Sequence, residues 1–181
     1  MSRIEKKLSS IARSAADDGL PGVAISLRQS LLDLRERRKY QTWLKLHQIT
    51  DETRKTLRAQ IADFATEPKL SIIMPVYDVE EKWLRLCIES VITQIYENWE
   101  FCIADDCSPS PHIKKILDEY SAKDHRIKVA FRSENGHISA ASNSALKLAT
   151  GEFCVLLDHD DELSEDALFW VSSEINDSSD V

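Results

Sequence analysis

The chain has 181 residues and a mass of 20.6 kDa, which limits it to one ordinary domain or one domain with a helical appendage. Hydrophobic residues make up 43% and charged residues 30%, a profile typical of a soluble globular protein, and no apolar run approaches the ~20 residues that span a bilayer. The first residues lack the apolar stretch of a secretory signal, so we expect a cytosolic protein.

The charge is distributed unevenly along the chain. Residues 1–67 contain 13 Lys and Arg against 9 Asp and Glu, a net charge of +4, whereas residues 68–181 carry a net charge of −12. An acidic body repels phosphates, which argues against a nucleic-acid groove there. A phosphorylated ligand would need a cation between it and this surface. The basic first part has acids interleaved among its cations, a pattern typical of solvated helix faces.

Residues 1–67 are predicted to form a helical N-terminal segment. Apolar residues recur at helical spacing from residue 4 to residue 15, and the Gly-Leu-Pro-Gly sequence at 19–22 predicts a break. A second helix is expected over 23–40. A third is expected to be capped by Thr50 or Asp51 and to end before Pro68.

From residue 68 onward, short apolar runs alternate with helical patterns. Strands are expected over 70–76, 101–104, 127–131 and 153–157. Helices are expected over 83–95, over 113–120, over 138–149 with Gly151 as the stop, and after a cap at Ser164. The order βαβαβαβα predicts an α/β fold, a Rossmann-like parallel sheet with helices on both faces, in a second domain over 68–181.

The cysteines are Cys87, Cys102, Cys107 and Cys154, and no two of them have CxxC spacing. We therefore expect free thiols in a reducing compartment. Cys102 and Cys154 lie inside apolar runs, which predicts that both are buried in the core.

Polar residues follow each expected strand, and in an open parallel sheet such segments meet at one edge, where ligands bind. We expect five acids to share that edge: Asp105, Asp106, Asp158, Asp160 and Asp161. Carboxylates packed together repel one another unless a cation joins them, and oxygen ligands suit Mg²⁺ or Mn²⁺. The alternative is that the acids cap helices. We prefer capping for Glu165 and Asp166 and the metal interpretation for Asp158 and Asp160, while Asp106 fits either.

Several common catalytic signatures are missing from the sequence. GxGxxG, GxxxxGK[ST] and GxSxG do not occur, so the usual glycine cradles for phosphates and the hydrolase nucleophile elbow are excluded. The serines near His137 are interpreted as small residues for close helix packing, not as members of a triad. His137 and His159 lie in loops of the expected site.

Four ordered segments carry a family resemblance: 72–77 (IIMPVY), 102–108 (CIADDCS), 134–143 (ENGHISAASN) and 156–161 (LLDHDD). Together they resemble family 2 glycosyltransferases with the GT-A fold, of the bacterial polysaccharide or O-antigen type that includes rhamnosyltransferase-like members. The resemblance covers residues 68–175.

The resemblance implies transfer of a sugar from a nucleoside-diphosphate sugar to a glycan or lipid-linked glycan acceptor, with inversion and with Mn²⁺ or Mg²⁺ as cofactor. It implies synthesis of a cell-surface polysaccharide in the cytoplasm, with peripheral contact at the inner face of the membrane and no nucleic-acid partner. Asp158 and Asp160 would be the metal ligands of a DxD motif. The nucleotide-binding residues would be Pro75, Val76, Tyr77, Asp78, Asp105, Asp106, Asn135, His137, Ser142, Asp158 and His159.

The sequence also departs from the family pattern. Many relatives have Arg where Ser142 stands, so a phosphate contact would have to come from elsewhere, with Arg132 as a candidate. The resemblance implies further strands, an acceptor platform and a carboxylate base beyond Val181, so we interpret the chain as a donor-binding fragment that is inactive alone.

Two alternatives remain open at this point. The chain can be a non-catalytic nucleotide-binding or protein-interaction module whose helical first part is the working surface. A phosphotransfer protein similar to a response regulator is disfavoured, because its acidic pair would follow the first strand and a Lys would follow a late strand. Here the acidic pair Asp105 and Asp106 follows the second strand.

Overall fold

The computed structural model describes residues 32, 34–43 and 48–178. The chain divides into two compact units, Met1–Gln48 and Ile49–Val181. In the first unit, the described residues of the helix expected over 23–40 are helical, and the helix continues to residue 43. The helix expected over 4–15 and the break at 19–22 lie outside the described residues.

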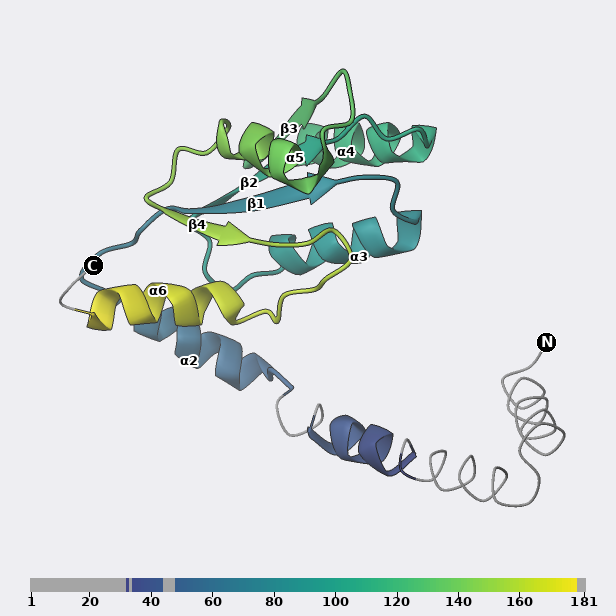
Figure 1. Ribbon diagram of the computed structural model, residues 1–181. Coiled ribbons are helices and arrows are strands. Elements are labelled where there is room, and N and C mark those ends of the chain that lie inside the picture. Colours follow the sequence, from purple (N-terminus) through teal and green to yellow (C-terminus); the bar gives the residue numbers. More distant parts are fainter. Residues whose placement is uncertain (1–31, 33, 44–47, 179–181) are drawn as a thin grey trace, which may run out of the picture. The chain divides into compact units, whose positions relative to one another are not determined.

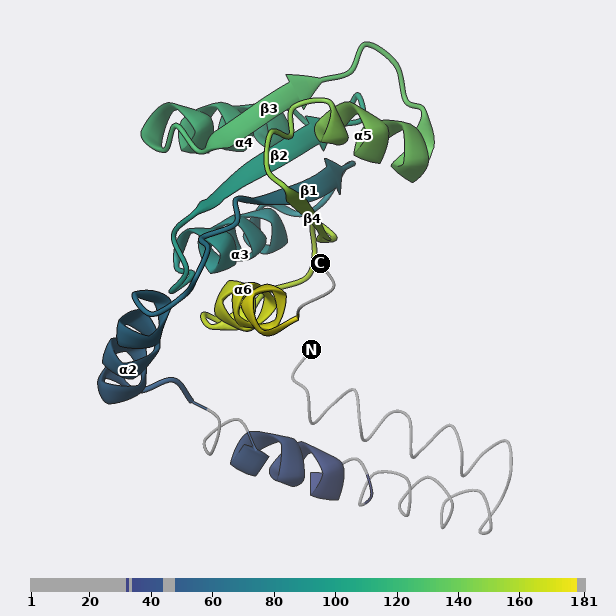
Figure 2. The same ribbon diagram turned by 90° about the vertical axis from the view of Figure 1, so that its left-hand side faces the viewer.

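The second unit is built on a four-stranded parallel sheet of β1 (Leu70–Val76), β2 (Trp99–Asp105), β3 (Ile127–Phe131) and β4 (Phe153–Leu156). The strand order is β3-β2-β1-β4 (Figure 2). Leu70 at the start of β1 is in register with Trp99 of β2 and with Phe153 of β4. The predicted parallel α/β architecture is therefore confirmed.

Helices cover both faces of the sheet (Figures 1 and 2). On one face, Leu70, Ile72 and Met74 are buried in a core shared with α3 (Glu81–Ile92) and α4 (Pro111–Lys123). On the other face, Ile73 packs with Ala145 of α5 (His137–Leu146). The alternation arises because successive strand residues point to opposite faces. The helices cover the faces of the sheet, and the carboxyl ends of β1, β2 and β4 lie at its edge, where they can form a site.

Helix α2 (Asp51–Ile61) belongs to the same compact unit as the sheet and contacts α6 (Ala167–Asp177). Its N-cap is Thr50, whose Oγ1 accepts a hydrogen bond from the Thr53 backbone N–H at 3.1 Å, as expected. Leu57 is buried in the main core, and Arg54 forms an ion pair with Glu165 at 2.7 Å. The boundary between the compact units therefore falls after Gln48, earlier than the expected domain boundary after residue 67.

The prediction that Gly151 stops a helix over 138–149 was wrong. Helix α5 ends at Leu146, and Gly151 lies against the start of β1, where a Cβ would collide with the Lys69 carbonyl oxygen. Close approach of two backbone segments thus requires this glycine. Ser164 is not a cap either. Helix α6 begins after Asp166, and Ser164 uses its carbonyl oxygen to accept hydrogen bonds.

The burial of Cys102 is confirmed, whereas Cys154 is exposed. Both residues lie in strands, but β4 is an edge strand. Helix α5 contacts β1, β2 and β3, so the side chains of β4 on that face of the sheet are left uncovered. None of the helices that the structure describes is long and apolar enough to cross a bilayer.

Candidate functional site

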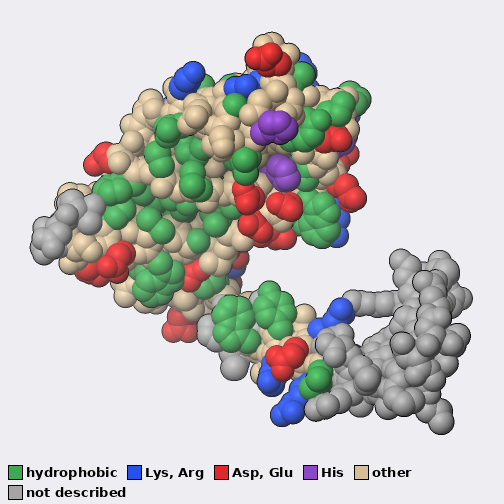
Figure 3. Space-filling view, in the orientation of Figure 1, with side chains coloured by type: hydrophobic (Ala, Val, Ile, Leu, Met, Phe, Trp, Pro, Cys, Tyr) green, Lys and Arg blue, Asp and Glu red, His purple; other side chains and the backbone are tan. Residues whose placement is uncertain are grey.

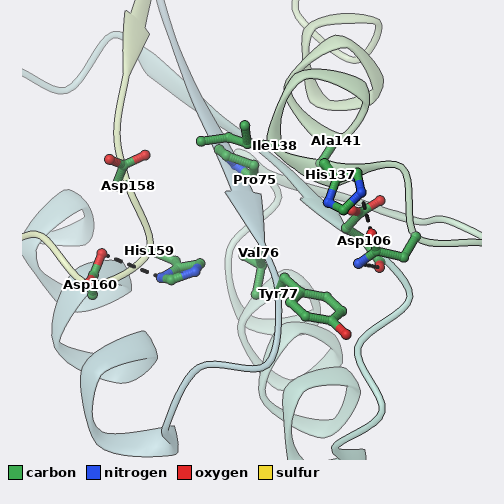
Figure 4. A pocket seen from close by; sticks show the side chains of 11 residues that line it. Pro75, Val76, Tyr77, Asp106, His137, Ile138, Ala141, Asp158, His159 and Asp160 are labelled. Atoms are coloured by element: carbon green, nitrogen blue, oxygen red, sulfur yellow. Dashed lines mark hydrogen bonds and ion pairs between the residues drawn. The ribbon is translucent and has the colours of Figure 1, made fainter.

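A pocket of about 410 Å³ opens where β1, β2 and β4 end (Figure 4). Its position agrees with the expectation that ligands bind at the carboxyl ends of parallel strands. Figure 3 shows histidine and acidic side chains gathered beside hydrophobic ones on this part of the surface. The lining residues are Pro75, Val76, Tyr77, Asp106, Asn135, His137, Ile138, Ala141, Asp158, His159 and Asp160.

The middle of the pocket is formed by the end of β1. Pro75 and Val76 complete the strand, and the half-exposed ring of Tyr77 follows directly after it. Asp78 then adopts a left-handed backbone with φ 44°, which turns the chain away from the cavity. Its backbone N–H donates to Ser108 Oγ at 3.0 Å, and its carboxylate accepts from the Ser110 hydroxyl. Asp78 therefore joins two loops and does not line the pocket.

The acids at the end of β2 are buried and hydrogen-bonded. Asp106 accepts from Arg132 Nε at 2.7 Å and from the Gly136 backbone N–H at 3.0 Å. Asp105 accepts from the Ser108 backbone N–H at 3.3 Å and does not line the pocket. Of this pair, only Asp106 reaches the cavity, and its charge is balanced by Arg132.

The Arg132 guanidinium connects the end of β2 to α5. Besides Asp106, it donates through Nη1 to Ser144 Oγ at 2.7 Å and to the Ala140 carbonyl oxygen at 3.2 Å. These three partners hold the planar group inside the protein. The suggestion that Arg132 supplies a missing phosphate contact is therefore not supported by its position.

The start of α5 supplies the opposite wall. His137 has a left-handed backbone with φ 62°, and its N–H donates to Asn135 Oδ1 at 3.2 Å. Ile138 and Ala141, one helical turn apart, line the pocket although sequence reasoning did not select them. Their three-residue spacing directly after His137 places both on the helix face that His137 begins, and this spacing could have predicted them. Ser142 is partly exposed, donates to the Ile138 carbonyl oxygen at 2.8 Å and lies outside the pocket.

The segment after β4 brings Asp158, His159 and Asp160 to the side of the pocket opposite Asp106 and His137 (Figure 4). Asp160 is largely exposed, whereas the His159 Nδ1 atom is buried without a hydrogen-bond partner, 3.6 Å from Asp160 Oδ1. All three residues are expected in the site from the sequence, and the structure brings them together there.

The five acids expected to crowd one edge are not gathered into one cluster. Asp105 and Asp161 do not line the pocket, and Asp106 is neutralised by Arg132. Within the described ranges, no group of three or more His, Cys, Asp or Glu side chains is arranged to hold a metal ion. Among the described residues, no Lys or Arg forms an ion pair with the pocket carboxylates Asp158 and Asp160. A Mg²⁺ or Mn²⁺ ion there would take its remaining ligands from water or from a bound ligand, as these ions usually do.

Comparison with known proteins places this sequence in a family. The family described as Glycosyl transferase family 2 matches residues 71–177. The chain is 49% identical over 109 residues to an uncharacterised protein, y4gI, of Sinorhizobium fredii. It is 36% identical over 108 residues to the O-antigen biosynthesis protein RfbC of Myxococcus xanthus. Each match covers 60% of this chain.

A solved structure shares both sequence and fold with the chain. TarS of S. aureus (residues 1–349), solved in complex with UDP-GlcNAc, matches with a TM-score of 0.55 and 30% identity, over 60% of this chain and 31% of that one. The chain spans only 12% of y4gI and 8% of RfbC.

Proposed function

The chain belongs to glycosyl transferase family 2, and on that premise we propose that its pocket binds the nucleoside-diphosphate part of a sugar donor. The sugar would be transferred to a glycan acceptor during synthesis of a cell-surface polysaccharide. Two similarities support the proposal: RfbC is an O-antigen biosynthesis protein, and TarS was solved with UDP-GlcNAc. The observation that carries it is the placement of Asp158 and Asp160 across one pocket from Asp106 and His137.

The two walls of the pocket suit different parts of such a donor. Pro75, Val76 and the exposed Tyr77 ring give the apolar surface that a nucleobase needs. Asp106 is held rigid by Arg132 and offers carboxylate oxygens to ribose hydroxyls. Asp78, Asp105 and Ser142 lie outside the cavity. We assign Asp78 and Asp105 to supporting the loops that carry the contact residues, and Ser142 to a hydrogen bond within α5.

Asp158 and Asp160 would hold a divalent cation, Mn²⁺ or Mg²⁺, and the diphosphate would lie beside them. Their oxygen-only donor set fits either ion. The lack of a glycine-rich phosphate loop leaves the charge of the diphosphate to be balanced in another way. When bound, such a cation stabilises the leaving diphosphate as the glycosidic bond breaks. The chain's own task is to orient the donor and to keep the two carboxylates in place.

Transfer with inversion also needs a base that takes the proton of the acceptor hydroxyl. Of the three carboxylates that line the described pocket, Asp106 is occupied by Arg132, and Asp158 and Asp160 are assigned to the cation. We therefore propose that the base is a carboxylate that does not line this pocket.

Isothermal titration calorimetry with UDP tests the proposal. With Mn²⁺ present we expect saturable binding, and with EDTA in place of Mn²⁺ we expect the heat of binding to disappear. Equal affinity under the two conditions would exclude a metal-bridged diphosphate. Absence of binding to both UDP and GDP with Mn²⁺ would exclude the nucleotide site itself.

A further inference from the structure

Three polar side chains lie on the buried side of α3 and its C-terminal extension: Cys87, Ser90 and Gln94. They are 0%, 9% and 4% exposed, at positions where an amphipathic helix normally presents apolar residues to the core. We refer to these three residues as the α3 ladder. We refer to residues 157–166, between β4 and α6, as the acidic loop.

Each member of the ladder contacts the backbone of the acidic loop or of the first turn of α6. Cys87 Sγ lies 3.5 Å from the Asp158 carbonyl oxygen, and Ser90 Oγ accepts from the Leu163 N–H at 3.1 Å. The Gln94 amide donates to the Ser164 carbonyl oxygen at 2.6 Å, and its Oε1 accepts from the Leu168 N–H at 2.9 Å.

The order of the contacts along the helix is also their order along the loop, so the loop runs beside the helix and is held at successive points. The backbone N–H of Ile95 extends the series by donating to the Glu165 carbonyl oxygen at 2.8 Å. A shift of the loop would remove the bonds that Ser90 Oγ accepts from Leu163 and Gln94 Oε1 accepts from Leu168, and an unpaired buried group costs ~1–3 kcal/mol. Within α3 and its extension, Ser90 Oγ also donates to the Cys87 carbonyl oxygen and the Gln94 amide to the Ser90 carbonyl oxygen, so these two donors have partners on the helix itself.

The acidic loop is rich in like charges. Residues 158–166 contain Asp158, Asp160, Asp161, Glu162, Glu165 and Asp166, which repel one another. The hydrogen bonds between backbone groups of this stretch are few, with Asp161 N–H donating to the Asp158 carbonyl oxygen at 3.1 Å as one example. Neighbouring elements therefore contribute to the order of this segment: Arg54 of α2 pairs with Glu165, and the α3 ladder contacts the loop at Asp158, Leu163 and Ser164.

We propose that Cys87, Ser90 and Gln94 are positioning residues that hold Asp158 and Asp160 in the arrangement required to bind a cation. Asp160 lies between two anchored points, the Asp158 carbonyl group and the Leu163 N–H. None of the three ladder residues lines the pocket, so they act through the loop and not on the ligand. The inference rests on the proposed function, since it assigns a purpose to the same site.

The test compares Gln94→Met and Ser90→Ala with a matched control, Tyr96→Phe. The Tyr96 hydroxyl is buried and donates to the Pro68 carbonyl oxygen at 2.7 Å, so its loss removes one buried hydrogen bond away from the pocket. For the two ladder variants we expect the affinity for Mn²⁺ with UDP to fall at least ~10-fold, the lower end of the range for residues that orient metal ligands. Tyr96→Phe should lose stability and keep wild-type affinity.

Hydrogen exchange in the free protein separates this inference from the proposed function. The ladder variants should exchange faster over residues 157–168, and the control should not. A folded Gln94→Met protein with wild-type affinity, or with wild-type exchange in this segment, would overturn the inference. If the wild-type protein does not bind Mn²⁺ with UDP, the proposed function fails, and the exchange data still decide whether the ladder fixes the loop.

Discussion

Arg132 and Asp106 form a partly buried ion pair, with the guanidinium Nε 2.7 Å from the carboxylate Oδ1. The pair joins the loop after β3 to the end of β2, and the same guanidinium reaches α5 through Ser144. Three elements that surround the pocket are thus fixed by one side chain. The pair also explains why an acid on the pocket wall can be charged without a metal ion beside it.

Arg132→Met should destabilise the protein by ~3 kcal/mol, because it leaves the buried Asp106 carboxylate without its cation. The measurement is urea denaturation of both proteins, with the midpoint compared at equal slope. Lys114→Met is the control. Its partner Asp118 is exposed, and removing such a surface pair should cost less than ~1 kcal/mol. Equal losses for the two variants would contradict the structural role of Arg132.

The parallel sheet could be predicted from the sequence because each buried strand is a short apolar run that ends in polar residues. The pairing of Arg132 with Asp106 could not, since the two residues are 26 positions apart and their contact depends on the register of β3 with β2, which pairs Phe131 with Asp105. The exposure of Cys154 could not be predicted from the local sequence either. Its apolar neighbours predicted burial, but its exposure follows from the place of β4 at the edge of the sheet, which local pattern does not encode.

The acids of the pocket illustrate what spacing alone can and cannot predict. Convergence of Asp106, Asp158 and Asp160 followed from a rule about strand ends, and the structure agrees. The rule does not indicate which acids have partners within the protein. The sequence offers Arg132 as a candidate for a phosphate contact, whereas its guanidinium pairs with Asp106. The expected repulsion among five carboxylates therefore does not arise at Asp106.

Asp160→Asn should abolish the Mn²⁺-dependent binding of UDP and slightly raise the melting temperature of the free protein. The variant loses a proposed metal ligand, and it also removes one of several like charges that lie close together after β4. Calorimetry and thermal denaturation without metal are the two measurements. A lower melting temperature in the free protein would mean that Asp160 is a structural residue instead.

Glu100 is predicted to make the protein sensitive to acid. Burial alone would raise its pKa, but hydrogen bonds from Lys128, Lys69, the Thr150 backbone and Ser71 outweigh burial and hold the pKa well below its usual value. The unfolded chain then binds the extra proton first, so the free energy of unfolding should decrease as the pH falls below about 4.5.

The variant Glu100→Gln tests this sensitivity. It should be less stable at neutral pH by ~2 kcal/mol, the range for a hydrogen bond to a charged group, and its stability should decline less steeply below the same pH. Denaturation curves between pH 3 and pH 7 provide the comparison, with the exposed Asp118→Asn as control. Parallel curves for wild type and Glu100→Gln would show that another carboxylate dominates acid unfolding.

The four thiols should react in two classes. Burial raises the pKa of Cys87 to about 12 and that of Cys102 to about 11, whereas Cys107 and Cys154 are exposed. Since the thiolate is the reactive form, iodoacetamide at pH 8 should modify Cys107 and Cys154 in the folded protein and reach the other two only after unfolding. Peptide mass spectrometry identifies the sites. Early modification of Cys87 would contradict the packing of α3 against the acidic loop.

The described pocket should bind a donor without by itself supporting transfer of the sugar. Donor binding needs the pocket and the cation, but an inverting displacement also needs a base and an acceptor hydroxyl held in line with the bond that breaks. The carboxylates of the described pocket are already assigned, Asp106 to Arg132 and the other two to the cation. UDP release from UDP-GlcNAc with Mn²⁺ should therefore be slow and limited to hydrolysis, and adding oligosaccharide acceptors should not accelerate it. Acceptor-dependent release would refute this. It would point to a base among the acids that follow the metal motif, and the variants Asp161→Asn and Glu162→Gln would then identify which carboxylate takes the proton.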